Sequence, residues 1–515
     1  MRLEDPEAIA HPPNLMTQPM ENHNDRLTSG HLLARNTLWN LVGNGAPILV
    51  AIVCIPLLIK GLGTERFGVL TLTWAVIGYA GLFDLGLGRA LTQLVAKKLG
   101  RGEDHEVPTL VWTSLLLMLA LGVVGAVVVV SLTPLLVVRV LHVPGALQAE
   151  TLNSFRLLGL SIPLVISTAG LRGFLEALQR FSLINALRIP TGIFTFVGPL
   201  LVLPFSKSLT QIVAVLVAGR LFSWLAHLIF CLRVAPALKQ HIAWDRAAVV
   251  PLLKYGGWMT VSNVVSPLMV TLDRFLIGAL LSVAAVAYYA TPYEVVTKFW
   301  LIPGALMGVM FPAFSTSFVR DRSRTARLYG QSVKYVLLVL FPMILLVVVM
   351  AQDGLKLWLG AEFAQNSTHV LRWLAVGVFI NSIAQVPFAL LQGVGKPDLT
   401  AKLHLIELPF YIVVLWWLTK AHGIEGAAIA WTARVAFDSL VLFVLAKQFV
   451  PIRIPFSSQT ILLAVLALVT LALATVPQGL MLKGVFLLLT ILSFSFCAWF
   501  LVLSPEERRF AQSFL

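Results

Sequence analysis

Residues 67–101, FGVLTLTWAVIGYAGLFDLGLGRALTQLVAKKLGR, begin as an apolar run long enough to cross a lipid bilayer as a helix. The run carries two ionisable residues, Asp84 and Arg89, near its end, and a basic cluster at 97–101 closes it. Ionisable groups inside a spanning helix are costly, so they usually face a bundle interior or a water-filled cavity. Basic clusters beside a span mark its cytoplasmic end. This stretch therefore predicts a membrane span, its direction and a polar inner face.

The same apolar character extends over the whole chain. Its 515 residues are 58% hydrophobic and 12% charged, and the mean hydropathy is +0.87. Apolar runs of about 18 or more residues recur along the sequence about fourteen times, and two of the predicted spans are 399–419 and 424–447. This composition predicts an all-α polytopic membrane protein with about 14 transmembrane helices. The three cysteines lie alone in separate apolar runs and indicate neither a disulfide framework nor a metal site.

Basic residues are distributed unevenly between the two alternating sets of loops. One set, which includes 97–101, 320–334 and 508–509, carries roughly three times as many Lys and Arg residues as the other. This bias predicts that both termini are cytoplasmic. Residues 1–33 are polar and contain several prolines, so we expect a disordered cytoplasmic tail rather than a signal peptide. Because the net charge of +14 is concentrated in loops beside spans, it does not indicate a nucleic-acid partner.

Weak internal similarity divides the chain into halves. A shift of 216 residues places Arg156 on Arg372, and a shift of 214 places Arg220 on Arg434. We interpret helices 1–6 and 7–12 as two parallel repeats, related by an axis along the membrane normal and followed by an appended helix pair. The predicted units are a six-helix lobe at 34–235, a second six-helix lobe at 250–450 and the pair at 455–505.

Several ionisable residues inside the apolar runs occur in pairs spaced four apart, where helical side chains are neighbours. The simplest interpretation is that each pair neutralises itself and so lowers the cost of membrane insertion. The three pairs are Arg172 with Glu176, Glu294 with Lys298, and Arg434 with Asp438.

Other ionisable residues lack such a partner. Arg220 has no acidic residue within reach on its own helix, although it falls near mid-span. Arg274 adjoins Asp273, but adjacent residues on a helix do not face each other. Arg89 could reach the cytoplasmic surface by snorkelling, and Asp84 could be its structural counter-ion.

Three stretches resemble a known family. The end of the opening stretch, FDLGLGRAL at 83–91, is similar to the end of the second helix in bacterial oligosaccharide (O-antigen type) flippases. LDRFLIG at 272–278, followed by VAYY at 286–289, and LQGVGKP at 391–397 also match. The resemblance covers about residues 34–450. It extends to the multidrug/oligosaccharidyl-lipid/polysaccharide exporter superfamily, which also holds multidrug antiporters and the lipid II flippase.

This resemblance implies a transporter without enzymatic activity or a cofactor. It would flip a polyprenyl-diphosphate-linked oligosaccharide across the bacterial inner membrane by alternating access, in surface polysaccharide biosynthesis. Its partners would be that lipid-linked substrate, the bilayer and polysaccharide assembly proteins. Arginine binds phosphate bidentately and keeps its charge when desolvated, so cations inside the bundle are candidates for the substrate site. The candidate substrate-binding residues are Arg220, Arg274, Lys298, Arg172, Arg434 and Arg89, and the candidate ion-coupling or counter-ion residues are Asp84, Asp273 and Glu294.

Other functions stay open at this point. A multidrug antiporter of the same superfamily should offer buried carboxylates and few unpaired arginines, which is the reverse of this chain. A membrane glycosyltransferase acting as a polysaccharide polymerase should carry a sizeable outer loop, and a scaffold for polysaccharide assembly has no sequence signature. The sequence has no HExxH or GxSxG motif, and GVGK at 393–396 lacks the early glycine of a phosphate loop. Neither the sugar nor the driving ion, proton or sodium, can be read from these residues.

Overall fold

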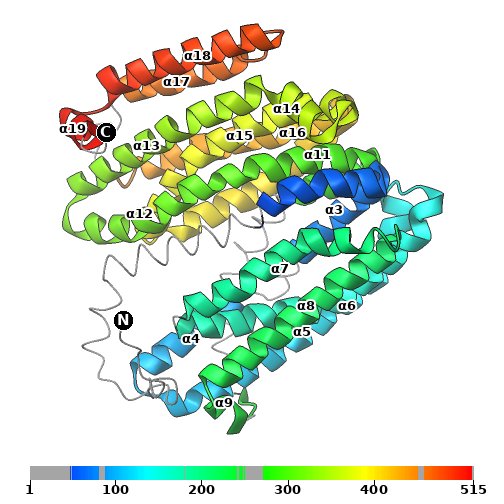
Figure 1. Cartoon of the computed structure of the whole chain (residues 1–515). Coiled ribbons are helices and arrows are strands. Elements are labelled where there is room, and N and C mark those ends of the chain that lie inside the picture. The colour runs from blue at the N-terminus through cyan, green and yellow to red at the C-terminus, as the bar shows by residue number, and fades with distance from the viewer. Residues whose placement is uncertain are drawn as a thin grey trace, which may run out of the picture.

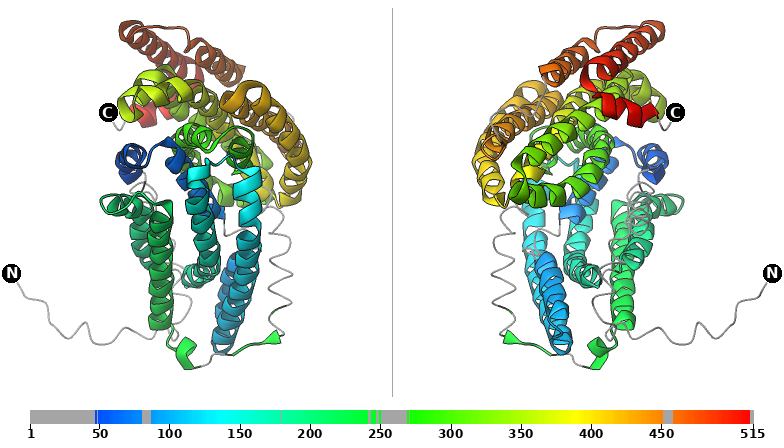
Figure 2. Two further views of the ribbon diagram at one scale, coloured as in Figure 1. Left: turned by 90° about the vertical axis from the view of Figure 1, so that its right-hand side faces the viewer. Right: turned by 90° about the vertical axis from the view of Figure 1, so that its left-hand side faces the viewer.

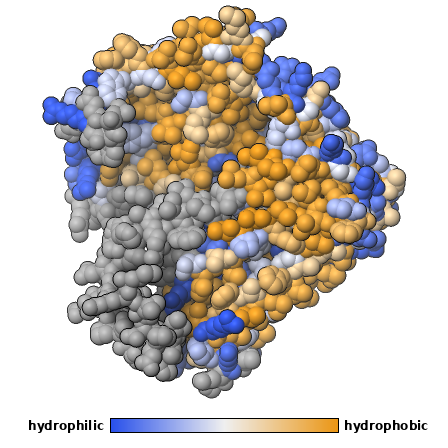
Figure 3. All heavy atoms as spheres, in the orientation of Figure 1, coloured by the Kyte–Doolittle hydropathy of each residue, from blue (hydrophilic) through white to orange (hydrophobic). Residues whose placement is uncertain are grey.

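The computed structural model describes residues 49–79, 87–178, 180–240, 243–246, 271–450 and 458–512, together with positions 47, 249 and 269. Throughout these residues the regular structure is helical, and no strand occurs among them. Eight of the described helices are long and apolar enough to cross a membrane. On the face shown in Figure 3, a broad hydrophobic band crosses the molecule, with hydrophilic residues gathered toward its ends. The all-α polytopic fold is therefore confirmed, while the number of fourteen spans stays a prediction.

The first group of helices packs through small residues that let backbones approach closely. In this group α5 packs on α6, and α6 packs on α4 and α8. A Cβ added to Gly122 would come within 2.5 Å of the Pro163 backbone, and one on Gly173 within 2.7 Å of the Gly88 carbonyl. The helices are Leu49–Leu62, α3 (Thr64–Tyr79), α4 (Leu87–Gly100), η3 (Asp104–Glu106), α5 (Val107–Leu135), η4 (Leu136–Val140), α6 (Gly145–Ala177), α7 (Phe181–Val202), α8 (Leu209–Val234) and α9 (Ala237–Gln240).

The second group ends in a hairpin of two spans that share one long helical element. α16 changes direction at His422 and Gly423, and Gly423 adopts a φ of +61°, which glycine tolerates because it has no Cβ. This break falls between the predicted spans 399–419 and 424–447. The elements are the helical segment 271–280, α11 (Val283–Val296), η5 (Thr297–Trp300), α12 (Leu301–Arg320), α13 (Arg322–Val349), α14 (Ala351–Leu359), α15 (Ala361–Gly393) and α16 (Pro397–Ala446).

The last helices pack on α13. They are α17 (Ser458–Leu473), α18 (Leu480–Cys497), η6 (Ala498–Val502) and the short α19 (Pro505–Gln512). Figure 2 shows α17 and α18 on the side of the second group that faces away from the first. On α19, Glu507 accepts hydrogen bonds from Lys334 Nζ at 2.6 Å and from the Tyr335 hydroxyl at 2.5 Å. Burial opposes ionisation of Glu507, but these two hydrogen bonds lower its pKa to about 2, so α19 stays attached to α13 at neutral pH.

The two groups meet near the end of the bundle that carries α14. There α3 packs against α11, and Gly68 lies so close that an added Cβ would come within 1.8 Å of the Val283 carbonyl oxygen. The His142 amide donates to the Gly278 carbonyl at 2.9 Å, and Trp358 Nε1 donates to the carbonyl of residue 52 at 2.6 Å. Toward α4, α9 and the α12–α13 turn, the helices of the two groups diverge (Figure 1). The bundle is therefore closed at the α14 end.

The predicted topology can be tested with single cysteines. Ser323 and Asp398 are exposed in one predicted set of loops, and Lys420 is exposed at the opposite end of the same hairpin as Asp398. With the three native cysteines replaced by serine, a cysteine at Ser323 or Asp398 should stay unlabelled by an impermeant thiol reagent in intact cells. A cysteine at Lys420 should be labelled, because the basic loops are expected to remain inside. Labelling at Ser323 from outside would contradict the predicted orientation.

Candidate functional site

The helical run 283–320 changes from α-helical to 3₁₀ geometry near its middle, at η5. Pro303 follows the change, and proline cannot donate the backbone hydrogen bond to the residue four positions before it. A 3₁₀ segment in the middle of a helix often marks a hinge or a functional site. The same segment carries Lys298, one of the predicted substrate-binding residues.

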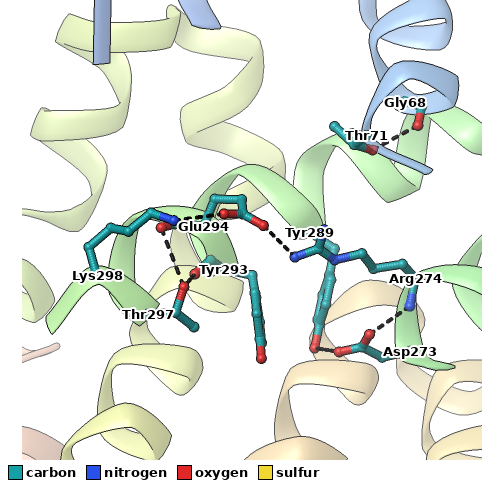
Figure 4. Close-up of polar contacts among 9 residues, drawn as sticks. All are labelled: Gly68, Thr71, Asp273, Arg274, Tyr289, Tyr293, Glu294, Thr297 and Lys298. Atoms are coloured by element: carbon teal, nitrogen blue, oxygen red, sulfur yellow. Dashed lines mark hydrogen bonds and ion pairs between the residues drawn. The ribbon is translucent and has the colours of Figure 1, made fainter. Parts of the chain in front are cut away.

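Glu294 joins two of the predicted cations at this break. Its Oε1 accepts a hydrogen bond from Arg274 Nη2 at 2.8 Å, and its Oε2 accepts one from Lys298 Nζ at 3.0 Å (Figure 4). Arg274 is buried, whereas the side chains of Glu294 and Lys298 are 37% and 39% exposed. The network therefore runs from the interior of the second group to an accessible edge near the middle of the helical run 283–320.

Asp273 anchors the buried side of this network. Its Oδ2 accepts a hydrogen bond from the Tyr289 hydroxyl at 2.5 Å, and its Oδ1 accepts one from the backbone amide of Arg274 at 2.7 Å. The Arg274 guanidinium turns away to Glu294 and lies over the Tyr293 ring, 5.1 Å from its centroid. This agrees with the expectation that adjacent side chains on a helix do not face each other. The four predicted residues of this region, Asp273, Arg274, Glu294 and Lys298, thus form one connected network.

The predicted pairing of Arg434 with Asp438 is wrong. Arg434 Nη1 lies 4.0 Å from Glu407 Oε2, and the guanidinium lies over the Tyr411 ring, 5.3 Å from its centroid. Asp438 Oδ1 instead lies 3.6 Å from Nε2 of His404. The physical reason is the break in α16, because its first half packs against the second and supplies partners that the second half alone does not contain. Spacing within one helix cannot reveal such partners.

Sequence reasoning therefore missed Glu407 and His404. The signal was available, because both residues interrupt the apolar run 399–419, and an ionisable residue inside a span is functional by default. Arg434 also lies within electrostatic reach of Asp273, which connects this cluster to the network around Glu294.

The predicted residues of the first group lie apart from that network. Arg172 Nε pairs with Glu176 Oε1 at 3.4 Å, as the spacing predicts, but both side chains are exposed. Arg220 lies on the face of α8 that carries the buried residues Ser223 and His227. Among the described residues, Arg220 has no carboxylate within ion-pair distance. Its side chain is only partly buried, so it is the candidate cation of this group that is best placed to take a ligand.

Two predicted residues belong to the opening stretch of the sequence. Arg89 lies in the first turn of α4, next to the point where Gly88 packs against α6. Asp84 lies outside the described residues, so its predicted pairing with Arg89 stays a prediction.

The candidate residues of the two helix groups offer electrostatic interactions with a ligand. Across the described part of the chain, no group of three or more His, Cys, Asp or Glu side chains could hold a metal ion. The partly exposed groups are instead Lys298 and Glu294 in the second group of helices and Arg220 in the first. Such a set can bind an anion, but it provides no paired nucleophile and base.

Comparison with known proteins identifies the family. Residues 33–318 match the model of a family described as polysaccharide biosynthesis protein. A protein of Shigella flexneri named "Putative O-antigen transporter" is 32% identical over 410 residues, which are 80% of this chain and 96% of the relative.

Two solved structures of a multidrug resistance MATE family transporter of the MOP superfamily have a similar fold. The inward-facing conformation aligns with a TM-score of 0.69 at 14% identity and covers 80% of this chain and 94% of the other. The outward-facing conformation aligns with a TM-score of 0.60, also at 14% identity, over 81% of this chain and 94% of the other. At this identity the similarity shows the fold alone.

The family match covers more than half of the chain, and the Shigella relative aligns over nearly its whole length. The resemblance seen in the three sequence motifs is thereby confirmed. This chain is a multi-pass membrane protein that belongs to the polysaccharide biosynthesis protein family.

Proposed function

We propose that this protein flips a polyprenyl-diphosphate-linked oligosaccharide from the cytoplasmic to the outer leaflet of the bacterial inner membrane, with both of its termini in the cytoplasm. The observation that carries the proposal is the partly exposed Lys298–Glu294–Arg274 network at the 3₁₀ break in the helical run 283–320. The family match and the name of the Shigella relative support the substrate class. Polysaccharide assembly proteins would supply the substrate and take up the product.

The physical problem is the transfer of a charged sugar head across hydrocarbon. The polyprenyl tail can stay in the lipid, but the diphosphate and sugars need a polar path. Among the described residues, Lys298 pairs with Glu294 only, and it is accessible, so a diphosphate can compete for its ammonium group. Arg220, which has no ionic partner among the described residues, would bind the same head from the first group.

Alternating access would be produced by rocking of two bodies, 34–235 and 250–450, about their contact at the α14 end. The contacts of Gly68 with Val283 and of His142 with Gly278 close that end. If the α14 end faces outward, as the basic loops predict, this conformation is open to the cytoplasm and ready to load substrate.

A multidrug antiporter is the second candidate, and the electrostatics disfavour it. A cationic cargo needs an accessible carboxylate that is free to bind it. Both carboxylate oxygens of Glu294 are already occupied by Arg274 and Lys298. The accessible side chain that can exchange its partner is Lys298, which favours an anionic cargo.

Lys298→Ala tests the proposed substrate contact. We expect transport to fall about tenfold or more, because a hydrogen bond to a charged group contributes about 1.5–3 kcal/mol. Surface polysaccharide and membrane abundance should be measured together in a strain that lacks the native gene. Lys402→Ala is a matched control, since Lys402 forms the same i,i+4 pair with Asp398 at 3.0 Å but on an exposed surface. Full surface polysaccharide in Lys298→Ala would remove this residue from the site.

Arg220→Ala tests the contribution of the first group. We expect normal abundance but loss of transport, and only partial recovery in Arg220→Lys, because lysine lacks the bidentate fork of arginine. Arg233→Ala, in the last turn of the same helix, provides the control. If Arg220→Ala instead lowers membrane abundance in proportion to transport, Arg220 has a structural role. The proposed contact between the substrate and the first group of helices would then be contradicted.

A further inference from the structure

Among the ionisable residues that the structure describes, Glu407 stands out because both of its carboxyl oxygens are buried and lack a hydrogen-bond donor. It lies in the first half of α16 and is only 3% exposed. Neither of its carboxyl oxygens accepts a hydrogen bond from any described residue, and the nearest cationic atom, Arg434 Nη1, lies 4.0 Å from Oε2. An ionised carboxylate that is buried without hydrogen bonds is costly, so the structure favours the neutral acid at this position.

The groups around Glu407 increase this preference. Asp438, which is also buried and whose Oδ1 accepts no hydrogen bond from the described residues, lies within electrostatic reach of Glu407. Two carboxylates that share a site do not both ionise readily. Among the described residues, the titratable and charged groups around Glu407 and its neighbour Arg434 are Asp438, His404 and Tyr411 from α16, Asp273 from segment 271–280 and Tyr289 from α11.

The net charge of the residues that connect Glu407 to the network around Glu294 also favours the neutral acid at Glu407. The cations of this set are Arg274, Lys298 and Arg434, and its carboxyl groups are Asp273, Glu294, Glu407 and Asp438. The carboxyl groups therefore outnumber these Lys and Arg cations by one. Arg274, Lys298, Tyr289 and the Arg274 amide donate to Glu294 or Asp273, whereas Glu407 receives no such donor. The extra charge is therefore removed most easily at Glu407.

We propose that Glu407 is a proton-binding site that couples the conformation of the second group to the proton gradient. A proton adds to one carboxyl oxygen and gives the neutral acid, which tolerates the 4.0 Å separation from Arg434. On loss of the proton, the Glu407 carboxylate draws the Arg434 guanidinium away from Tyr411 and Asp273. His404, one helical turn from Glu407 and 3.6 Å from Asp438, carries the proton to and from the site.

A proton fits this site better than a metal cation. A sodium ion at Glu407 would lie next to the Arg434 guanidinium and would need several further oxygen ligands. A proton needs only the carboxyl group and leaves the cation in place. The coupling role rests on the proposed transport function, but proton binding itself does not.

The test is an infrared pH titration of the purified full-length protein in lipid vesicles, with Glu407→Gln and with Glu425→Gln as the control. Glu425 lies on the same helix and is 42% exposed. We expect the wild type and Glu425→Gln to show a protonated carboxyl band that disappears as pH rises, and Glu407→Gln to lose the contribution of one carboxyl group. In His404→Gln the band should remain, but proton exchange should slow.

An unchanged band in Glu407→Gln would overturn the inference, and so would a band that sodium at constant pH removes as effectively as a rise in pH. If Glu407→Gln does not fold, Glu407→Asp serves instead, since its band should be shifted rather than lost. The infrared measurement needs no substrate. A protein that binds the proton but does not transport lipid-linked oligosaccharide would therefore contradict the proposed function and leave the proton site standing.

Discussion

Arg274→Met should lower the free energy of unfolding more than any other single change in the charged network, by about 3–5 kcal/mol. The substitution keeps most of the side-chain volume but removes a buried guanidinium that is bonded to Glu294 at 2.8 Å and lies close to Asp273. Glu294 then keeps only the Lys298 ammonium as a donor among the described residues, and the carboxylate of Asp273 loses a nearby positive charge. Thermal unfolding of the detergent-solubilised protein and membrane abundance measure the effect.

The matched control is Arg172→Met, which breaks an ion pair on the exposed face of α6. That change should cost less than about 1 kcal/mol, because exposed pairs contribute little. The double variant Arg274→Met/Glu294→Gln should be more stable than the sum of the single effects indicates, since it removes both charges of the Arg274–Glu294 pair. Equal losses in Arg274→Met and Arg172→Met would mean that the buried position of Arg274 adds nothing to the stability that its ion pair provides.

Gly68→Val should give the largest effect on conformation. A Cβ at position 68 comes within 1.8 Å of the Val283 carbonyl oxygen, which is backbone and cannot rotate away. Overpacking of this kind costs about 1–3 kcal/mol, and here the cost falls on the contact between α3 and α11. The closed arrangement at the α14 end should therefore lose about tenfold or more of its population, and transport should fall with it.

Cysteine accessibility measures this shift. Thr71, one turn further along α3, is buried, so Thr71→Cys in a background without the native cysteines should be protected from an impermeant thiol reagent. The same cysteine should be labelled when Gly68→Val is added. Gly308→Ala is the control, because a Cβ at that helical position meets nothing within 4 Å. Unchanged protection of Thr71→Cys in the Gly68→Val background would show that the α3–α11 contact does not close the bundle.

Local spacing explains what could be predicted along each helix. The Glu294–Lys298 and Arg172–Glu176 pairs follow from the rise and turn of a single helix, and both are present at 3.0 Å and 3.4 Å. The boundary between the predicted spans 399–419 and 424–447 likewise falls at Gly423, whose positive φ interrupts α16. These features need no knowledge of which helices are neighbours.

The partners across helices could not be predicted in this way. Arg434 faces Glu407 rather than Asp438, and Arg274 reaches Glu294, which is 20 residues away on another helix. A helix has several faces, and in a membrane the lipid is as apolar as the faces of neighbouring helices. Hydropathy alone therefore does not show which face of a helix contacts a given neighbour.

The sequence by itself therefore determined the class of the protein, because its apolar runs can only be satisfied as spanning helices that bond their own backbone. It also determined the family, through three short motifs. Only the tertiary structure decided which charges meet, which end of the bundle is closed and which carboxyl group, Glu407, is left without a donor. The physical reason is that these outcomes depend on distances between atoms of different helices, and packing sets those distances.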